Sequence, residues 1–539
     1  MIEFKHKFPR MYVDDKQVST YNNNESGLPG VFTGCDSRLG LFMQTLRNII
    51  RNDRRLVFID NKMLACTINW IRDNVHEMKA FRHWDFTIKD FLDFIIETQR
   101  DDGQFFELIK QLDDGHWRFV NEDCRRIYED DNLALVRLEI EADIEYLVVE
   151  GAAYCYKVFS DKKWLKKVLP KLEKGINYMT SDPKRWDDEH QLVKRAFTID
   201  TWDFAFGQRT SNRRIEPNTP MTIMHGDNSG VYQAMRQLAW FNEQLGDSEK
   251  AEEWNKRAEE LKENIFKYLW NGKFFVHQLY LGHNGADNLE GKRLSLSNTY
   301  DINRNLTNLE QSQSIISEYI GRRNKTGYFA EWFTIDPPYA KEVWNMEPGT
   351  YVNGAISPYT GGELAKAAFN NGYEEYGWDI LTRLMDMVER DGSLYFLYYP
   401  DNAKNQGGGP SGWGAASILS AVDEGLAGIV DADTGYKIIN FSPRFVVTEY
   451  TELRYLTGYE ATDTLVDVRF IVSDKGIRYD IISPADKICA HILLPKGKSC
   501  SAFFINDKKA EFKITEIGSS KYVDATAESD GKVSFEIIF

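Results

Sequence analysis

The chain has 539 residues, of which 42% are hydrophobic and 27% are charged, and its formal net charge is −16. This length exceeds what one hydrophobic core usually holds, so we expect a globular protein of two domains. The acidic balance argues against nucleic acids and anionic membranes as partners.

The six cysteines contain no CxxC pair and no metal-site spacing, which favours reduced thiols. The sequence also lacks a dinucleotide fingerprint, an HExxH pair and an EF-hand loop, so we expect neither a metal nor a cofactor. No apolar run reaches 18 residues, and the first 15 residues lack the apolar segment of a signal peptide. The sequence therefore predicts a cytoplasmic enzyme without a membrane span.

Helical periodicity begins after a polar, irregular segment, residues 1–34. Three later stretches repeat one pattern, in which a helix rich in small residues, a short polar turn and a helix with one charged face follow each other: 146–179, 231–270 and 361–390. We expect these hairpins to stack side by side. The first helix of each hairpin would lie inside and the second outside.

Stacked hairpins close in one of two ways, as an open solenoid or as a toroid whose loops meet at one mouth. The loops here are long and rich in Trp, Asp, Gly and Asn, which favours the toroid, over residues 35–430. After residue 430 short segments alternate apolar and polar residues, which predicts a β-sandwich over 431–539. The expected fold is thus mainly α, with a C-terminal β-sandwich.

An acid–tryptophan–acid pattern stands in the stretch AFTIDTWDFAFGQR, residues 196–209, where Asp200 and Asp203 flank Trp202. Burial beside an indole raises the pKa of a carboxyl group and prepares it to act as a general acid near neutral pH. The aromatic face also suits the apolar face of a sugar ring. The alternative is a short strand with Asp as a helix cap and Trp in the core.

Two further stretches place acids at the start of expected helices. WIRD supplies Trp70, Arg72 and Asp73, and Asp73 is either a helix cap or a carboxylate that accepts hydrogen bonds from sugar hydroxyls. MHGDNSG places Asp227 where an inner helix would begin at the toroid mouth. A lone histidine such as His225 is more often structural.

Two loops complete the set of candidates. Glu347 lies in the loop of the stretch 344–365 and is a catalytic candidate, whereas Glu363 falls in the following helix and is expected to be structural. The glycine-rich stretch 391–417 lacks the Lys–Ser/Thr of a phosphate loop, and its Trp413 could stack on a sugar. The alternating acids of 138–150 suit a solvated helix face better than a metal site.

Together these motifs resemble those of the (α/α)6-barrel glycosidases, the group of trehalases, debranching glucosidases and bacterial α-L-rhamnosidases. WIRD is similar to their sugar-binding loop, TIDTWDF to their ESGWDF segment, YVNGAISP to the loop before a barrel helix, and GGGPSGWGAAS to their glycine-rich stretch. The resemblance implies a six-hairpin toroid with Asp203 as the general acid. The residues expected to contact substrate are Trp70, Arg72, Asp73, Asp200, Trp202, Asp227, Tyr351, Asn353 and Trp413.

The chain departs from these relatives at their general base, a glutamate before a Tyr–Tyr pair, because Leu397 stands there. A displaced base (Asp401, Glu347 or Glu331) is one explanation. Attack by inorganic phosphate, which needs no base, and loss of the chemistry are the others. We expect an inverting, exo-acting glycoside hydrolase; the alternatives are a phosphorylase, a non-catalytic carbohydrate-binding protein and a helical scaffold.

Overall fold

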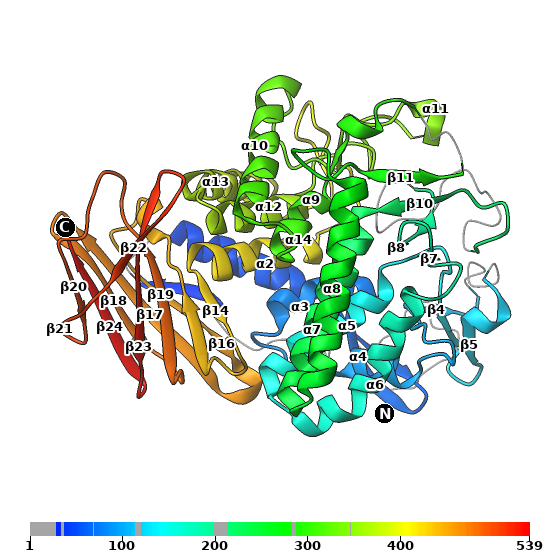
Figure 1. Ribbon diagram of the computed structural model, residues 1–539, viewed down its shortest axis with the longest axis horizontal. Helices are drawn as coiled ribbons and strands as arrows, with labels where there is room; N and C mark the ends of the chain where they lie inside the picture. Colours follow the sequence, from blue (N-terminus) through cyan, green and yellow to red (C-terminus); the bar gives the residue numbers. More distant parts are fainter. Residues whose placement is uncertain are drawn as a thin grey trace.

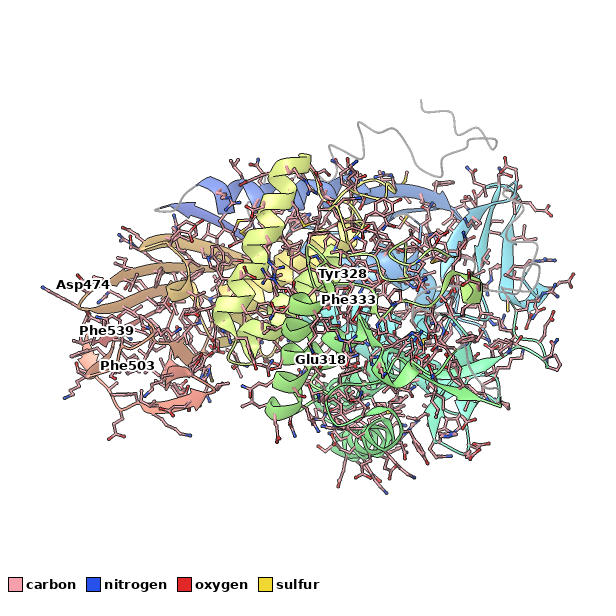
Figure 2. All side chains as sticks on the ribbon, turned by 90° about the horizontal axis from the view of Figure 1, so that it is seen from above. Glu318, Tyr328, Phe333, Asp474, Phe503 and Phe539 are labelled. Carbon is pink, nitrogen blue, oxygen red and sulfur yellow. The ribbon has the colours of Figure 1, made fainter. Side chains whose placement is uncertain are left out.

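The computed structural model describes residues 28–33, 37–67, 69–113, 120–198, 214–282, 287–344 and 346–539. A helical body and a β-body lie side by side (Figure 1). Seen from above, the β-body carries Phe503 and Phe539, and the helical body carries Tyr328 and Phe333 (Figure 2). The molecule thus has a helical part and a β part.

Six largely buried helices form the centre of the helical body, and we call them the inner helices. They are α3 (Ile71–Phe81), α5 (Ile144–Phe159), α7 (His225–Leu245), α9 (Ser297–Asn303), α12 (Pro358–Asn370) and α14 (Gly412–Ser420). Each contacts the next along the chain, and α14 contacts α3. Small residues on these helices allow the close contacts; α12 and α14 alone carry Gly361, Gly362, Gly414, Ala415 and Ala416.

Six further helices, the outer helices, each contact at least one of the inner helices. They are α2 (Ser37–Asp53), α4 (Asp90–Glu97), α6 (Lys162–Met179), α8 (Ser248–Leu269), α10 (Leu309–Thr326) and α13 (Glu374–Asp391). In α8 the buried side chains recur at helical spacing, while Glu and Lys cover the other face. The predicted hairpins are confirmed as the pairs α5–α6, α7–α8 and α12–α13.

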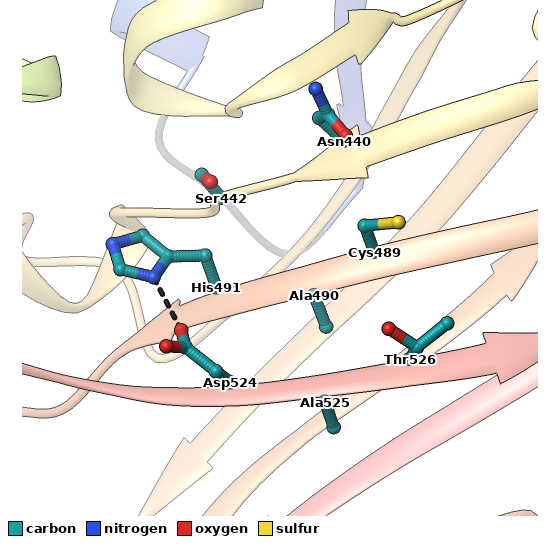
Figure 3. Close-up of a pocket in the computed structure, with 8 residues that line it drawn as sticks. All are labelled: Asn440, Ser442, Cys489, Ala490, His491, Asp524, Ala525 and Thr526. Carbon is teal, nitrogen blue, oxygen red and sulfur yellow. Dashed lines mark hydrogen bonds and ion pairs between the residues drawn. The ribbon is translucent and has the colours of Figure 1, made fainter. Parts of the chain in front are cut away.

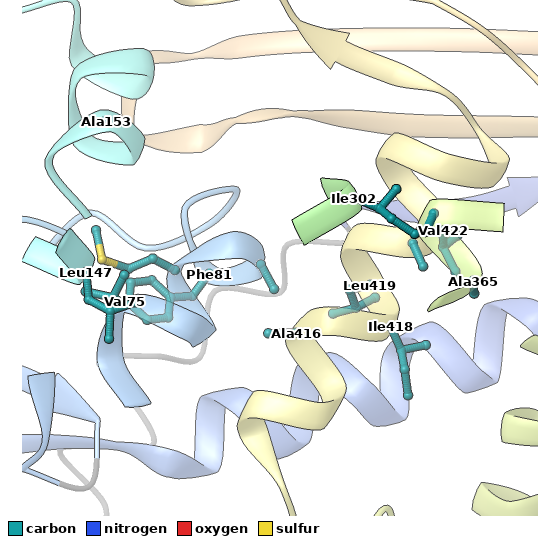
Figure 4. Packing of buried hydrophobic residues seen from close by; sticks show 14 of the residues in the cluster. Val75, Phe81, Leu147, Ala153, Ile302, Ala365, Ala416, Ile418, Leu419 and Val422 are labelled. Atoms are coloured by element: carbon teal, nitrogen blue, oxygen red, sulfur yellow. The ribbon is translucent and has the colours of Figure 1, made fainter. Parts of the chain in front are cut away.

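The core of the helical body consists of aliphatic and aromatic side chains from facing helices (Figure 4). Val75 of α3 lies near Leu147 of α5, and Ile418 and Leu419 of α14 face the neighbouring helices. Burial of such side chains from water is the main force that holds the helices together.

Gly230 allows an unusually close approach of α7 to α5. A Cβ atom at this position would overlap the ring of Tyr146, whereas a Cβ at Gly321 of α10 would meet no atom within 4 Å. We therefore expect Gly230→Ala to lower the free energy of unfolding by about 1–3 kcal/mol through overpacking. Gly321→Ala, the matched control, should raise it by about 0.5–1 kcal/mol. Urea unfolding of both variants measures the contrast, and equal effects would contradict it.

Short strands lengthen the loops that precede the inner helices. A hairpin, β2 (Arg54–Ile59) and β3 (Lys62–Thr67), precedes α3, and β9 (Arg195–Ala196) pairs with β10 (Met221–Met224) before α7. A small sheet of β4 (Leu108–Gln111), β5 (Arg125–Tyr128) and β6 (Leu133–Val136) precedes α5. These excursions gather polar residues at one end of the inner helices.

Two facing sheets form the β-body, as the sequence predicts. One has the order β14 (Ile429–Asp431), β15 (Ile438–Phe441), β19 (Lys487–Leu493), β23 (Ser520–Glu528), β22 (Lys513–Ile517). The other has the order β1 (Gly30–Thr33), β16 (Glu452–Tyr459), β17 (Thr464–Ser473), β18 (Gly476–Ile482), β24 (Lys532–Ile538), β20 (Ala502–Ile505), β21 (Lys508–Lys509). Residues 30–33 were expected to be irregular; instead they form the edge strand β1, because Gly30 and Val31 pair with β16.

A shallow cavity of about 430 Å³ lies on the outer face of the five-stranded sheet (Figure 3). Nδ1 of His491 forms a hydrogen bond of 2.5 Å with Oδ1 of Asp524, and the imidazole ring stacks on Tyr522. Cys489 also lines the cavity, and it is a free thiol like the other four described cysteines. The cavity involves the strands of the β-body alone.

Candidate functional site

The N-terminal ends of the inner helices lie close together, as contacts between side chains of different helices show. The contacts are Arg72 of α3 with Asp143 before α5, His225 of α7 with Asp301 of α9, and Trp413 of α14 with Tyr359 of α12. The loops that precede the helices therefore meet in one region, which we call the convergent end. Helix N-termini also carry partial positive charge, which favours carboxylates there.

Arg72 is the centre of a buried ion-pair network at the convergent end. Its Nε lies 2.5 Å from Oδ2 of Asp143, and its Nη2 lies 2.8 Å from Oδ1 of Asp143 and 3.0 Å from Oε2 of Glu141. All three side chains are buried. These two nitrogens therefore hold acids rather than stand free for a sugar, so Arg72 positions the neighbouring carboxylates.

The acidic run 138–150 is buried, so its interpretation as a solvated helix face is wrong. Glu141, Asp143 and Glu145 are each 0% exposed. Every residue from 138 to 150 is buried, and the acids of this run meet arginines: Arg72 pairs with Glu141 and Asp143, and Arg137 donates to Glu145 at 3.2 Å. An ion pair offsets part of the cost of burying each charge.

Asp227 is the least satisfied acid of the convergent end. It lies in the first turn of α7 and is 0% exposed, and neither carboxylate oxygen has a hydrogen-bond partner among the described residues. Arg195 on β9 comes no closer than 3.8 Å, from Nη1 to Oδ1. Burial raises the pKa of Asp227 to about 6, although Arg195 lowers it.

Asp73 and Trp70 lie beside this network and are partly accessible. Burial raises the pKa of Asp73 to about 6, while the adjacent Arg72 lowers it. The guanidinium of Arg72 lies 5.8 Å from the ring centroid of Trp70. An accessible carboxylate and an accessible indole suit the sugar contact that the sequence predicts, which stays a prediction. Asp200, Trp202 and Asp203 lie outside the described residues.

The loop before α12 contains two of the predicted substrate contacts, the exposed Tyr351 and the buried Asn353. Tyr351 is exposed, and its backbone N–H donates to the side chain of Gln406 in the glycine-rich loop. Asn353 is buried. Its side-chain amide donates to the carbonyls of Tyr339 and Met346 and accepts from the backbone N–H of Tyr339. Its amide therefore braces the loop, and substrate contact by Asn353 stays a prediction that these hydrogen bonds do not favour.

Trp413 lies among other aromatic side chains. Its indole stacks on His76 with centroids 3.9 Å apart and on Tyr359 at 5.0 Å, and its Nε1 donates to Tyr300. Trp413 belongs to an apolar cluster that also contains Leu397. These contacts favour a structural role for Trp413, and its stacking on a sugar stays a prediction. The position of the missing glutamate is filled by a packed leucine.

The three candidate bases have different surroundings. Glu331 is buried and bound by Arg383 at 2.7 and 2.8 Å and by Tyr376, so it is a structural acid. Glu347 is exposed and ion-paired with Lys341, and Asp401 is exposed. Glu363 was expected to be structural, and its carboxylate accepts hydrogen bonds from Lys79 and Asn303, which agrees with that expectation.

Sequence reasoning missed Glu141, Asp143 and Arg195 as site residues. The available signal was the position of the acids 139, 141, 143 and 145, which run directly into the apolar, buried helix α5. His225 is structural, as expected of a lone histidine: its Nδ1 contacts Asp301 at 2.6 Å and its Nε2 contacts Ser295 at 2.8 Å.

Within the described ranges, no three His, Cys, Asp or Glu side chains are arranged to hold a metal ion. None of the helices in the described part of the chain is both long and apolar enough to traverse a bilayer.

The chain was compared with protein-family models, curated sequences and solved structures. The sequence model of the trehalase family matches residues 195–330, which include Asp203, Asp227 and α7. No curated protein sequence matches the chain. The predicted resemblance to the (α/α)6-barrel glycosidase clan is confirmed by this match together with the structures below, and no single family within the clan is resolved.

Several solved structures share the fold at low sequence identity. An α-L-rhamnosidase from Dictyoglumus thermophilum is 12% identical with a TM-score of 0.62; the match covers 95% of this chain and 50% of the rhamnosidase. The GH78 rhamnosidase of Bacillus sp. GL1 is 12% identical with a TM-score of 0.59; the match covers 87% of this chain and 43% of that enzyme. The GH63 mannosylglycerate hydrolase of Thermus thermophilus, in complex with glucose, is 14% identical with a TM-score of 0.51; the match covers 71% of this chain and 99% of the hydrolase. This chain spans half or less of the rhamnosidases' length.

Proposed function

We propose that this chain is a glycoside hydrolase that removes a terminal sugar from an oligosaccharide or glycoside with inversion. In this account residues 35–430 form the catalytic domain, with the inner helices closed into an (α/α)6 toroid, and 431–539 form the β-sandwich. The unbroken series of contacts from α3 to α14 and back supports the toroid. The trehalase-family match over residues 195–330 supports the activity.

One observation carries the proposal: buried carboxylate oxygens at the convergent end have no hydrogen-bond partner within the described chain. They are both oxygens of Asp227 and Oε1 of Glu141. Native proteins rarely bury such groups without a ligand or an ordered water. A sugar supplies several hydroxyl donors on a compact ring, and so it suits a site with spare acceptors beside an arginine.

The proposed roles follow from this arrangement. Asp203 protonates the departing glycosidic oxygen, and a second carboxylate on the opposite side of the ring activates water. Inverting enzymes separate the two groups by about 6.5–9.5 Å to admit that water. The proposed substrate contacts are Trp70, Asp73, Asp200, Trp202, Asp227 and Tyr351, with Arg72 positioning them.

A phosphorylase is the second candidate, and Leu397 is the observation that favours it. Because this residue is packed in an apolar cluster, no carboxylate occupies the position of the relatives' general base. Inorganic phosphate is itself a nucleophile, so a phosphorylase needs no such base. Its product would be a sugar phosphate.

Sugar release from a panel of glycosides tests the proposal. The panel contains α-L-rhamnosides, α- and β-glucosides, trehalose and mannosylglycerate, each with and without inorganic phosphate. The hydrolase predicts release that does not depend on phosphate. Release that requires phosphate would establish the phosphorylase, and binding without turnover across the panel would indicate a carbohydrate-binding protein. The cytoplasmic location stays a prediction.

A further inference from the structure

The hydrolase proposed above needs a group that accepts a proton from water, and the described chain limits where that group lies. Leu397 is apolar, and Glu331 is held by Arg383 and Tyr376. Glu347 and Asp401 are exposed at the surface, and Glu347 is also paired with Lys341. A catalytic base needs unoccupied lone pairs and a site that excludes bulk water. None of these four side chains meets both requirements.

Asp227 meets both. It is fully buried, and both of its carboxylate oxygens lack a hydrogen-bond partner in the part of the chain that the structure describes. It lies in the first turn of α7, so its backbone is fixed by a 21-residue helix. The 3.8 Å distance to Nη1 of Arg195 is too long for a direct hydrogen bond, so Arg195 leaves the lone pairs of Asp227 unoccupied.

The surroundings of Asp227 provide charge balance without occupying its oxygens. Arg195 also reaches Oε2 of Glu141 at 3.4 Å, so one guanidinium lies between two acids. Oε1 of Glu141 is likewise buried and without a partner among the described residues. Arg195 stands on β9, which pairs with β10, the strand that leads directly into α7 and Asp227.

Burial raises the pKa of Asp227 to about 6, so at neutral pH this carboxyl group is ionised and can accept a proton. Burial also raises the pKa of Glu141, while the pairing of its carboxylate with Arg72 and Arg195 lowers it. The other charged groups that act on Asp227 are Asp143, which raises its pKa, and Arg195, Arg185 and Arg304, which lower it.

We propose that Asp227 is the catalytic base, the residue that takes the proton of the attacking water. As the water oxygen bonds to the anomeric carbon, one water proton passes to a carboxylate oxygen of Asp227. The glycosidic bond breaks, its electron pair stays on the leaving oxygen, and that oxygen takes a proton from the general acid. The products are a free sugar and an alcohol, and Asp227 returns its proton to solvent. This inference rests on the proposed hydrolase function.

Chemical rescue tests the assignment. In Asp227→Ala the rate on a glycosyl fluoride should fall by at least about 10²-fold. Azide needs no deprotonation and should restore turnover, with a glycosyl azide of inverted configuration as the product seen by NMR. The wild-type rate should also rise with pH through about 6, where Asp227 ionises. Asp386→Asn, an exposed partner of Arg38, is the control and should keep the wild-type rate.

Asp227→Asn separates a catalytic role from a structural one. The amide removes a buried charge without breaking a hydrogen bond to the described residues, and Arg195 keeps its pairing with Glu141, so the thermal midpoint should stay unchanged or rise while activity is lost. An active Asp227→Ala, a midpoint that falls in Asp227→Asn, or azide rescue in Glu347→Gln or Asp401→Asn instead would each overturn the assignment. If the wild type itself releases no sugar, the proposed function fails rather than this assignment.

Discussion

Replacing Asp203 with Asn is expected to lower kcat on natural glycosides by about 10²-fold or more, because the amide cannot protonate a poor leaving group. The effect should shrink on aryl glycosides whose leaving groups depart as stable phenolates, since these need no acid. The measurement is kcat on a natural glycoside and on a dinitrophenyl glycoside, for wild type and variant. The ratio of the two losses reports the acid role directly.

Asp200→Asn is the matched control, because it removes the other acid of the same stretch. A residue that only binds substrate should raise KM for both substrates by a similar factor. If Asp203→Asn behaved in this way, or kept the full rate on natural glycosides, Asp203 would not be the general acid.

Replacing Arg137 with Met is expected to lower the free energy of unfolding by about 3–5 kcal/mol, because it leaves two buried carboxylates without their partner. Arg137, Glu107 and Glu145 are each 0% exposed, so water cannot replace the lost hydrogen bonds. Urea unfolding followed by circular dichroism measures the change. The variant should also lose activity, since α5 and the acids before it depend on this pair.

Arg469→Met is the control for Arg137→Met. Arg469 forms a single pair with Glu452 on the outer face of the seven-stranded sheet, where both side chains are about half exposed. Its loss should cost no more than about 1 kcal/mol. Similar losses for the two arginines would show that the buried network contributes no more than a surface pair.

The helical body follows from local sequence patterns. Apolar spacing and small residues in 146–179, 231–270 and 361–390 were enough to predict three hairpins with the correct inner and outer helices. The strand β1 was not predictable in this way, because its stability comes from pairing with β16, more than 400 positions later in the chain. Tertiary pairing decides such short strands.

The candidate site was predicted less completely than the fold. Motif likeness identified Asp73 and Asp227, which do lie at the convergent end, but it could not tell a free polar group from an occupied one. Asn353 and Trp413 match motif positions, yet their polar atoms and ring faces are used within the protein. Glu141 escaped notice because alternating acids suggest solvent exposure, and only the fold brings Arg72 and Arg195 to them.

The central claim is hydrolysis of a glycosidic bond with inversion, and a proton NMR time course of the reaction tests it most directly. The spectrum is followed from the first minute on the panel substrate that the wild type cleaves fastest, before mutarotation mixes the anomers. The account predicts that the free sugar first appears as the anomer opposite to that of the substrate. Retained configuration, a sugar phosphate as the product, or no release from any substrate would contradict it.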